Sequence, residues 1–311
     1  MKSIKALFIL ILIVIAVKPA KAQQETMYTQ YMFNMLAINP AYAGSRNVTS
    51  VTALYRDQWI GIAGAPKTAT ATIDMPIDDK KVGLGLQVYS DQIGITTTSG
   101  AFLSYAYRIR FDRGTLSFGL QGGASQYRAD FTSVALNTGS PVDIAFSQNV
   151  NKLLVDLGTG VYYNTDRFYL GISSPQLLSN KLTNLAVTGN STFAGQSLHY
   201  FIASGYVFPI NNGDLNFKPS ILIKGVRGAP LQADINATLW IKDVVAFGAQ
   251  YRTDSSVAGL VEIQISPQLR LGYSYDASTT SLVQYNSGSH EIMLRYEFGY
   301  PKGKILSPRY F

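Results

Sequence analysis

After a short N-terminal stretch, this chain alternates apolar and polar residues in about fourteen segments joined by alternately short and long connections. Residues 114–121 read GTLSFGLQ, so Leu116, Phe118 and Leu120 share one face of an extended strand while Ser117 lies on the other. One such face suits hydrocarbon and the other suits water. A soluble two-sheet sandwich alternates in the same way, so the pattern alone leaves both fold classes open.

The N-terminus has the features of a secretory signal peptide. Lys2 and Lys5 precede an apolar run over residues 6–17, and an A-x-A cleavage site follows that run. The run is too short to span a bilayer as a helix. We therefore expect cleavage after Ala22, which makes residues 1–22 a signal peptide and the mature chain an exported protein.

Composition then favours the membrane. The chain has no cysteine, which excludes disulfides, thiol catalysis and Cys-zinc sites. Its formal charge of +7 includes four lysines of the expected leader, so charge gives little argument for a nucleic-acid partner. Only 14% of residues are charged, while 20 Tyr and 15 Phe suit the aromatic girdles of an outer-membrane barrel. We expect an all-β transmembrane antiparallel β-barrel of about fourteen strands in the outer membrane.

The alternation predicts strands over residues 48–57, 67–75, 82–90, 99–109, 115–124, 153–163, 167–173, 197–208, 215–223, 231–239, 243–251, 257–265, 269–276 and 289–298. The count is even, as is usual for single-chain bacterial barrels. Long connections at residues 125–152, 174–196 and 277–288 all fall at one end of such a barrel. We expect them to face outward and the short turns to face the periplasm, with lipid of the outer membrane around the wall.

Two segments lie outside this pattern. Residues 23–47 do not alternate, and we expect a periplasmic or lumen-inserted segment with a short helix that ends before Asn39-Pro40. Residues 299–311 are expected to form a periplasmic C-terminal tail. The barrel itself, residues 48–298, is predicted to be one domain.

Charged side chains of both signs have inward parity in the predicted strands. They are Arg108, Lys218, Asp234, Glu262, Arg270, Glu291, Arg295 and Glu297. A selective pore would more plausibly show one sign, whereas mixed signs favour a structural lattice of ion pairs. The alternative is a passive or hydrophobic-solute channel.

Candidate catalytic residues are few, so we expect no enzyme, no cofactor and no metal site. His199 has inward parity and His290 outward parity, and neither belongs to a recognisable nucleophile motif. An enzyme at the outer rim is the third alternative. Gly83 and Gly85 lie within a strand with no helix after them, so we interpret them as sites of curvature and close packing rather than as a phosphate loop.

Three phrases resemble a known family. MYTQYMFNMLAINPAYAGS at residues 27–45, TALYRDQWIGIAGAPKT at residues 52–68 and SPRYF at residues 307–311 closely resemble the PorP/SprF family of Bacteroidetes outer-membrane proteins. The resemblance implies a non-enzymatic barrel of the type IX secretion and gliding-motility machinery. Such a barrel either works with a periplasmic, peptidoglycan-linked protein or holds a secreted surface adhesin with a type B C-terminal domain.

The candidate partner-binding residues form two groups: Tyr28, Tyr31 and Phe33, and then Arg56, Asp57, Gln58 and Trp59. The first group belongs to the aromatic N-terminal segment. The second lies where the first strand meets the first outward loop, and it reads either as a partner-binding rim or as an interface-anchoring Trp beside an Arg/Asp pair.

Overall fold

The computed structural model describes residues 27–77, 81–133, 148–180, 198–226 and 229–298. The expected signal peptide and C-terminal tail lie outside the described residues, as does much of the two longest connections.

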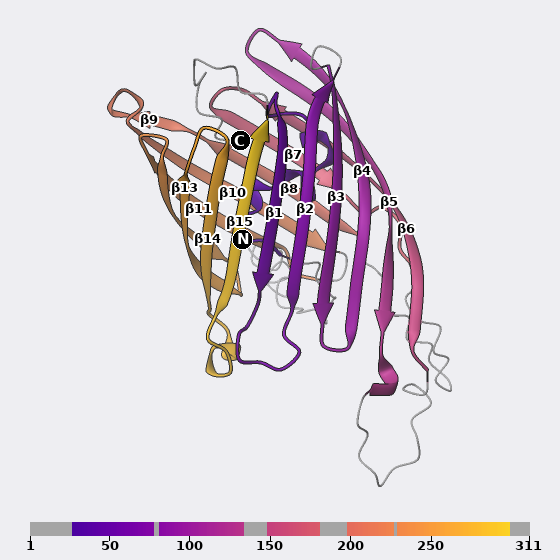
Figure 1. Ribbon diagram of the computed structural model, residues 1–311. Coiled ribbons are helices and arrows are strands. Elements are labelled where there is room, and N and C mark those ends of the chain that lie inside the picture. The colour runs from indigo at the N-terminus through magenta and orange to yellow at the C-terminus, as the bar shows by residue number, and fades with distance from the viewer. Residues whose placement is uncertain (1–26, 78–80, 134–147, 181–197, 227–228, 299–311) are drawn as a thin grey trace, which may run out of the picture.

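A closed antiparallel β-barrel of fourteen strands makes up nearly all of the described chain (Figure 1). Its elements are β1 (Thr49–Asp57), β2 (Lys67–Ile77), β3 (Val82–Ile93), β4 (Thr96–Phe111), β5 (Gly114–Ala129), β6 (Val150–Asn164), β7 (Phe168–Ser174), β8 (His199–Tyr206), β9 (Phe208–Ile210), β10 (Leu215–Val226), β11 (Gln232–Ile241), β12 (Val245–Arg252), β13 (Ser256–Gln264), β14 (Leu269–Ser278) and β15 (Ser289–Phe298). The predicted fold class and strand count are confirmed.

Each strand pairs with its neighbours in sequence, and β15 pairs with β1 to close the sheet. Elements β8 and β9 are one strand of the wall, because both pair with β10 and only Val207 separates them. In the register of β10, Tyr206 at the end of β8 faces Pro219, and Val207 faces Lys218. Proline has no N–H to donate to the ladder, which explains the break.

The two faces of the wall follow the predicted alternation. On β5, Phe118 and Leu120 are 46% and 62% exposed, whereas Ser117 and Gln121 are 0% and 6% exposed. Exposed large apolar side chains recur on every long strand, and the polar side chains between them point into the barrel. This is the surface that hydrocarbon requires, and closure leaves no unpaired strand edge within the bilayer.

The barrel has two unlike ends. The connections β5–β6, β7–β8 and β14–β15 lie at one end together with the β1–β2 loop, and we call this the loop end. Shorter connections such as β4–β5, β6–β7 and β11–β12 lie at the other, which we call the turn end.

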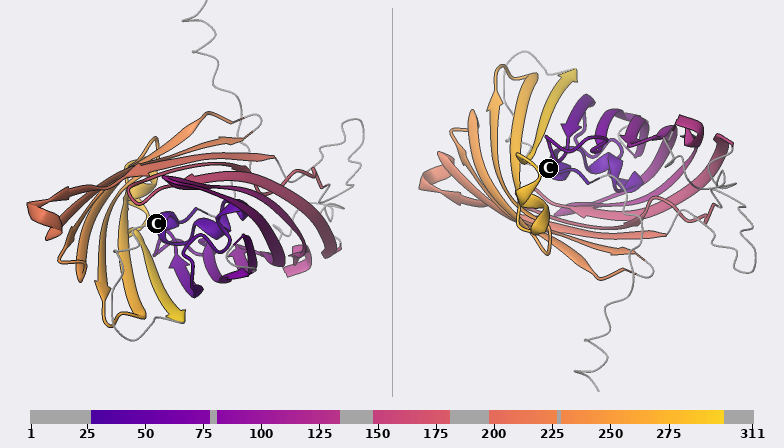
Figure 2. Two further views of the ribbon diagram at one scale, coloured as in Figure 1. Left: turned by 90° about the horizontal axis from the view of Figure 1, so that it is seen from above. Right: turned by 90° about the horizontal axis from the view of Figure 1, so that it is seen from below.

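Residues 27–47 lie inside the barrel, and we call this segment the plug (Figure 2). It contains three 3₁₀ turns, η1 (Tyr31–Phe33), η2 (Met35–Ala37) and η3 (Pro40–Tyr42), where the sequence predicts one short helix. The Asn39 side chain accepts a hydrogen bond from the Ala41 N–H and starts η3. Among the described residues, no helix is long and apolar enough to cross a membrane.

Candidate functional site: the plugged lumen

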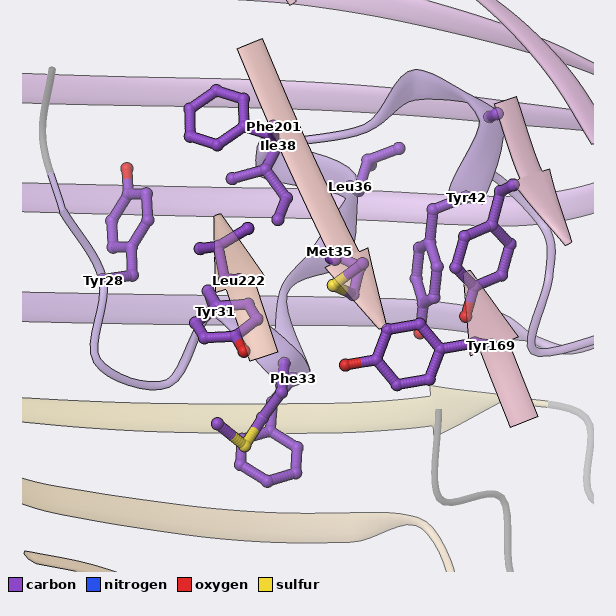
Figure 3. Close-up of a cluster of buried hydrophobic side chains, with 14 of the residues drawn as sticks. Tyr28, Tyr31, Phe33, Met35, Leu36, Ile38, Tyr42, Tyr169, Phe201 and Leu222 are labelled. Carbon is purple, nitrogen blue, oxygen red and sulfur yellow. The ribbon is translucent and has the colours of Figure 1, made fainter. Parts of the chain in front are cut away.

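The plug supplies about half of the buried apolar core of the described chain (Figure 3). Its side chains Tyr31, Met32, Phe33, Met35 and Leu36 are each at most 3% exposed. The wall around them is largely polar on its inner face, so these side chains pack mainly against one another and against a few apolar wall residues. The hydrophobic effect that stabilises a soluble protein's centre therefore acts here within the lumen.

The wall approaches the plug backbone closely at glycines. A Cβ atom on Gly83 of β3 would lie 1.9 Å from the carbonyl oxygen of Ala43, and one on Gly119 of β5 would lie 2.1 Å from the backbone nitrogen of Ala41. No side chain fits at such distances, so only glycine allows this contact. The close-packing role expected for Gly83 agrees with this position.

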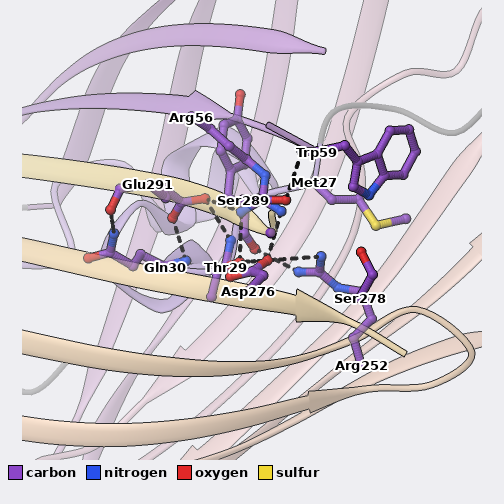
Figure 4. A network of polar contacts seen from close by, with 12 residues as sticks. Met27, Thr29, Gln30, Arg56, Trp59, Arg252, Asp276, Ser278, Ser289 and Glu291 are labelled. Carbon is purple, nitrogen blue, oxygen red and sulfur yellow. Dashed lines mark hydrogen bonds and ion pairs between the residues drawn. The ribbon is translucent and has the colours of Figure 1, made fainter. Parts of the chain in front are cut away.

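A buried polar network at the loop end holds the start of the plug (Figure 4). Glu291 of β15 accepts the backbone N–H groups of Thr29 and Gln30 at 2.9 and 2.7 Å. The Thr29 hydroxyl donates to Asp276 of β14 at 2.6 Å. Arg56 of β1 binds Asp276 at 2.7 Å and Glu291 at 3.1 Å. One buried guanidinium thus bridges two carboxylates that bind the plug.

Asp234 extends this network around the wall. It pairs with Lys224 of β10 and with Arg252 of β12, both at 3.0 Å. Arg252 also donates to the Tyr28 carbonyl oxygen at 3.3 Å. Buried charges in this half of the lumen are therefore paired with one another and with the plug backbone, as burial demands.

A second set of contacts holds the plug at the turn end. Arg46 binds Glu297 of β15, with Nε donating at 2.6 Å. The Gly44 N–H donates to Asp74 of β2 at 3.0 Å. Burial by itself lowers the pKa of Arg46, but Glu297 and neighbouring groups together outweigh it and raise this pKa above its ordinary value. Arg46 therefore remains charged in place.

Between these ends, aromatic and cationic side chains meet. Lys218 Nζ lies 5.6 Å from the Phe33 ring centre, and the Arg295 guanidinium lies 6.0 Å from the same ring. The Tyr31 hydroxyl accepts a hydrogen bond from the Asn236 side chain at 2.9 Å. Burial raises the pKa of Tyr31 well above its ordinary value, so this hydroxyl stays neutral.

The structure separates the candidate partner-binding residues. Tyr28, Tyr31 and Phe33 are buried inside the barrel, and Arg56 is buried in the loop-end network. Their contacts are with the wall and the plug of the same chain.

Asp57, Gln58 and Trp59 are part-exposed at the loop end. Trp59 has a positive φ of 52°, which is unusual for a non-glycine residue. The backbone N–H of Trp59 donates to Ser289 Oγ at 3.1 Å. The adjacent Ile60 exchanges backbone hydrogen bonds with the β14–β15 connection. The β1–β2 and β14–β15 loops are therefore joined into one ledge, which we call the rim.

The two histidines lie on opposite faces of the wall. His199 is buried on the lumen side, with its ring stacked on Phe201, whereas the His290 Nδ1 atom lies 2.6 Å from the Tyr273 hydroxyl on the outer side. They cannot act on one substrate. Within the part of the chain that the structure describes, no cluster of three metal-ligating side chains occurs.

Sequence reasoning missed Thr29, Arg252 and Asp276 as parts of the plug network. A signal existed for the two strand residues, because each has inward parity near the loop end of its strand. Inward parity does not reveal a partner, since Thr29 is 247 residues from Asp276.

One of the solved outer-membrane barrels compared shares this fold by TM-score. The chain resembles the CymD monoaromatic hydrocarbon channel, with a TM-score of 0.51, 11% identity and coverage of 88% of this chain and 94% of that one. A Pseudomonas aeruginosa FadL homologue matches with a TM-score of 0.46, 13% identity and coverage of 86% and 94%. Omp33 of Acinetobacter baumannii matches with a TM-score of 0.44, 8% identity and coverage of 81% and 98%. At 11% identity, the CymD match shows the fold alone.

No curated protein matches this sequence. The family model described as type IX secretion system membrane protein PorP/SprF matches residues 20–296, which is most of the chain. This match confirms the resemblance carried by residues 27–45 and 52–68. The chain therefore belongs to the PorP/SprF family of type IX secretion system membrane proteins, and it is an outer-membrane β-barrel.

Proposed function

We propose that this barrel docks protein partners of the type IX secretion and gliding machinery, without enzymatic activity, and does not conduct solutes. Its partners are a periplasmic, peptidoglycan-linked component at one end or a secreted surface protein, such as an adhesin with a type B C-terminal domain, at the other. Family membership supports the association with secretion machinery.

The plug is the single observation that carries this proposal. Residues 27–47 fill the lumen with buried apolar side chains, and both ends of the segment are held by charged groups of the wall. A channel needs a continuous polar path, whereas here the inward charges are engaged with the plug or with each other. The plugged barrel thus serves as a rigid scaffold, and its two ends are the surfaces at which partners would bind.

At the loop end, the rim offers the better partner surface among the candidate residues. Asp57, Gln58 and Trp59 keep part of their surface, and the rim loops are fixed to one another by backbone hydrogen bonds. A large aromatic side chain on a rigid ledge is a favourable anchor for a protein partner. Arg56 takes no part in this surface, because it is buried beneath it.

The test is surface display in cells. Deleting the gene should abolish gliding or display of one or several type IX clients, while uptake of small solutes stays unchanged. Replacement of Asp57, Gln58 and Trp59 by Ala should reproduce this loss if the rim holds a secreted client. The matched variant at the turn end replaces the exposed Asp112 and Arg113 by Ala, and it should reproduce the loss if a periplasmic partner docks there. Normal display and gliding in the deletion strain would contradict the proposal.

A further inference from the structure

An open groove lies on the outer face of β15, β1, β2 and β3, which are neighbours in the wall (Figure 1). Its floor consists of small outward side chains: Ala53 of β1 and Ala69 and Ala71 of β2. Larger apolar side chains border the floor on both sides: Ile292 and Leu294 of β15 and Val88 of β3. The groove has a volume of about 570 Å³. Ligand pockets in proteins typically measure about 300–1,000 Å³.

The groove faces hydrocarbon, because it lies on the lipid side of the barrel wall. The polar side chain at its edge is already paired, since the Ser90 hydroxyl lies 3.0 Å from that of Ser99. An acyl chain in such a groove contacts protein on the floor and on both sides. It therefore gains more dispersion energy than an acyl chain on a flat part of the wall.

A charged pair lies next to the groove at the loop end. Asp57 of β1 and Lys67 of β2 are directly opposite each other in the register, and both point outward. Ala69 is the next outward residue after Lys67 on the same strand, about 7 Å away. Tyr55 faces Ala69, and Tyr273 of β14 lies in the same row of the wall. Tyrosines mark the membrane interface in such barrels, so the charged pair lies at the depth of the lipid headgroups.

The charges of this pair complement one kind of headgroup. Lys67 Nζ lies 3.8 Å from Asp57 Oδ2, which is longer than a hydrogen bond, and both side chains are part-exposed. Ammonium donors and carboxylate acceptors therefore remain available side by side. A phosphate group binds Lys67 and a primary ammonium group binds Asp57 by charge-assisted hydrogen bonds. These two groups are adjacent in a phosphoethanolamine headgroup, whereas a purely anionic headgroup would meet the like charge of Asp57.

We propose that the groove and the Lys67–Asp57 pair form a binding site for one lipid with a phosphoethanolamine headgroup. The phosphate contacts Lys67, the ammonium contacts Asp57, and the first part of one acyl chain lies over Ala69 and Ala71. Other lipids surround the wall as solvent, whereas this lipid is held at one position. The inference does not rest on the proposed docking function, because it is argued from the lipid face of the wall alone.

A second groove on the outer face provides a matched control. It surrounds Gly122 of β5, and its outward lining residues are Leu84, Leu103, Tyr105, Leu120 and Leu157. Its volume, about 470 Å³, is similar to that of the first groove. Toward the loop end, the outward residues Ala124 and Gln126 separate Gly122 from the next charged outward residue of β5, Arg128. This groove therefore offers apolar surface without an adjacent headgroup site.

Native mass spectrometry of the purified full-length protein tests the proposal. The protein in mild detergent is titrated with phosphatidylethanolamine or with phosphatidylglycerol, which has the phosphate but no amine, and the occupancy of the first bound lipid is measured. The variants are Lys67→Gln, which removes the cation, and Ala71→Leu, which fills the groove. Gly122→Leu fills the second groove, where an added Cβ would lie 3.5 Å from Leu157.

We expect the unmodified protein and Gly122→Leu to bind phosphatidylethanolamine several-fold more tightly than phosphatidylglycerol. Ala71→Leu and Lys67→Gln should each weaken the binding of phosphatidylethanolamine several-fold. Far-UV circular dichroism shows whether each variant is folded, and Lys67→Gln carries the test if Ala71→Leu does not fold, because Lys67 is 54% exposed.

Three results would overturn the proposal. The first is equal affinity of the unmodified protein for the two lipids, and the second is equal weakening by Gly122→Leu and Ala71→Leu. The third is a protein in place of a lipid as the main crosslinked product in cells when Ala69 is replaced by the photoreactive residue p-benzoylphenylalanine.

Discussion

At the scale of single residues, we expect buried ion pairs to contribute more to the stability of the fold than exposed ones. Arg56 bridges Asp276 and Glu291 in the loop-end network, and its side chain is 2% exposed. The nearby pair of Lys67 with Asp57 has the same charges at 3.8 Å, but Lys67 is 54% exposed. The two pairs therefore form a matched comparison of buried and solvated ion pairs.

We expect Arg56→Ala to lower the free energy of unfolding by about 3–5 kcal/mol, because it leaves Glu291 buried without its cation and removes the nearer cation of Asp276. Lys67→Ala should lower it by less than about 1 kcal/mol, since water screens an exposed pair. Urea unfolding of both variants in the same detergent or lipid, followed by tryptophan fluorescence, measures the difference. Equal effects of the two substitutions would show that the network does not stabilise the fold.

The same residue shows where sequence reasoning stopped. The sequence places Arg56 correctly where the first strand meets the first outward loop, but Arg56 is not among the residues to which the sequence analysis assigns inward parity. The sequence cannot say that Arg56 binds Asp276 and Glu291, which are 220 and 235 residues away. Such pairing depends on the closure and register of the whole barrel. The sequence alone therefore could not distinguish a partner-binding role for Arg56 from a structural one.

At the scale of elements, the strands were predictable, whereas the sequence offered a lumen-inserted segment only as one of two alternatives and predicted one short helix in it. Every predicted strand overlaps an observed one, because period-2 alternation is enforced by lipid on one side and polar groups on the other. In the plug no such two-sided rule applies, since Tyr31, Met35 and their neighbours are buried on all sides. Three short 3₁₀ turns let successive side chains meet different parts of the wall, which one regular helix would not.

The close contact between the plug backbone and the wall can be tested at Gly119. A valine there must displace the plug backbone near Ala41, whereas Gly259 on the outer face of β13 has nothing within 4 Å of an added Cβ. In a Met32→Cys background, we expect Gly119→Val to increase reaction of the cysteine with a small thiol reagent several-fold. Gly259→Val should leave the reaction at its background level, because Met32 is 2% exposed in the native protein. Equal reactivity of Met32→Cys with Gly119→Val and with Gly259→Val would refute the close contact between the plug and the wall at Gly119.

At the scale of the whole molecule, plug and wall should unfold together. The plug is bound at both ends of the barrel and shares the apolar core about equally with the wall, so neither part has an independent interior. The chain has two tryptophans, Trp59 at the loop end and Trp240 near the turn end of β11. In the Trp59→Phe variant the fluorescence of Trp240 reports from the turn end, and in the Trp240→Phe variant that of Trp59 reports from the loop end. We expect each fluorescence midpoint in urea to equal the far-UV circular dichroism midpoint of the same variant. Clearly separate midpoints would mean that the two ends unfold independently.

The membrane location and family of the molecule could be inferred from the sequence, but the state of its lumen could not. Alternation, aromatic content and the phrases at residues 27–45 and 52–68 indicated an outer-membrane barrel of the PorP/SprF family. The same residues 27–45 turn out to form the plug, so part of the family resemblance lies in the segment that fills the barrel. The sequence pattern indicates which residues are buried, but only the structure of the closed barrel shows that these residues are buried inside the lumen.

The most direct test of the central claim is conductance of the purified full-length protein in planar lipid bilayers. We expect no stable open channel, because residues 27–47 occupy the lumen, and we expect channel openings in the Gly119→Val and Arg56→Ala variants, whose plug is loosened. A large, stable conductance from the unmodified protein would contradict the account and favour a solute channel.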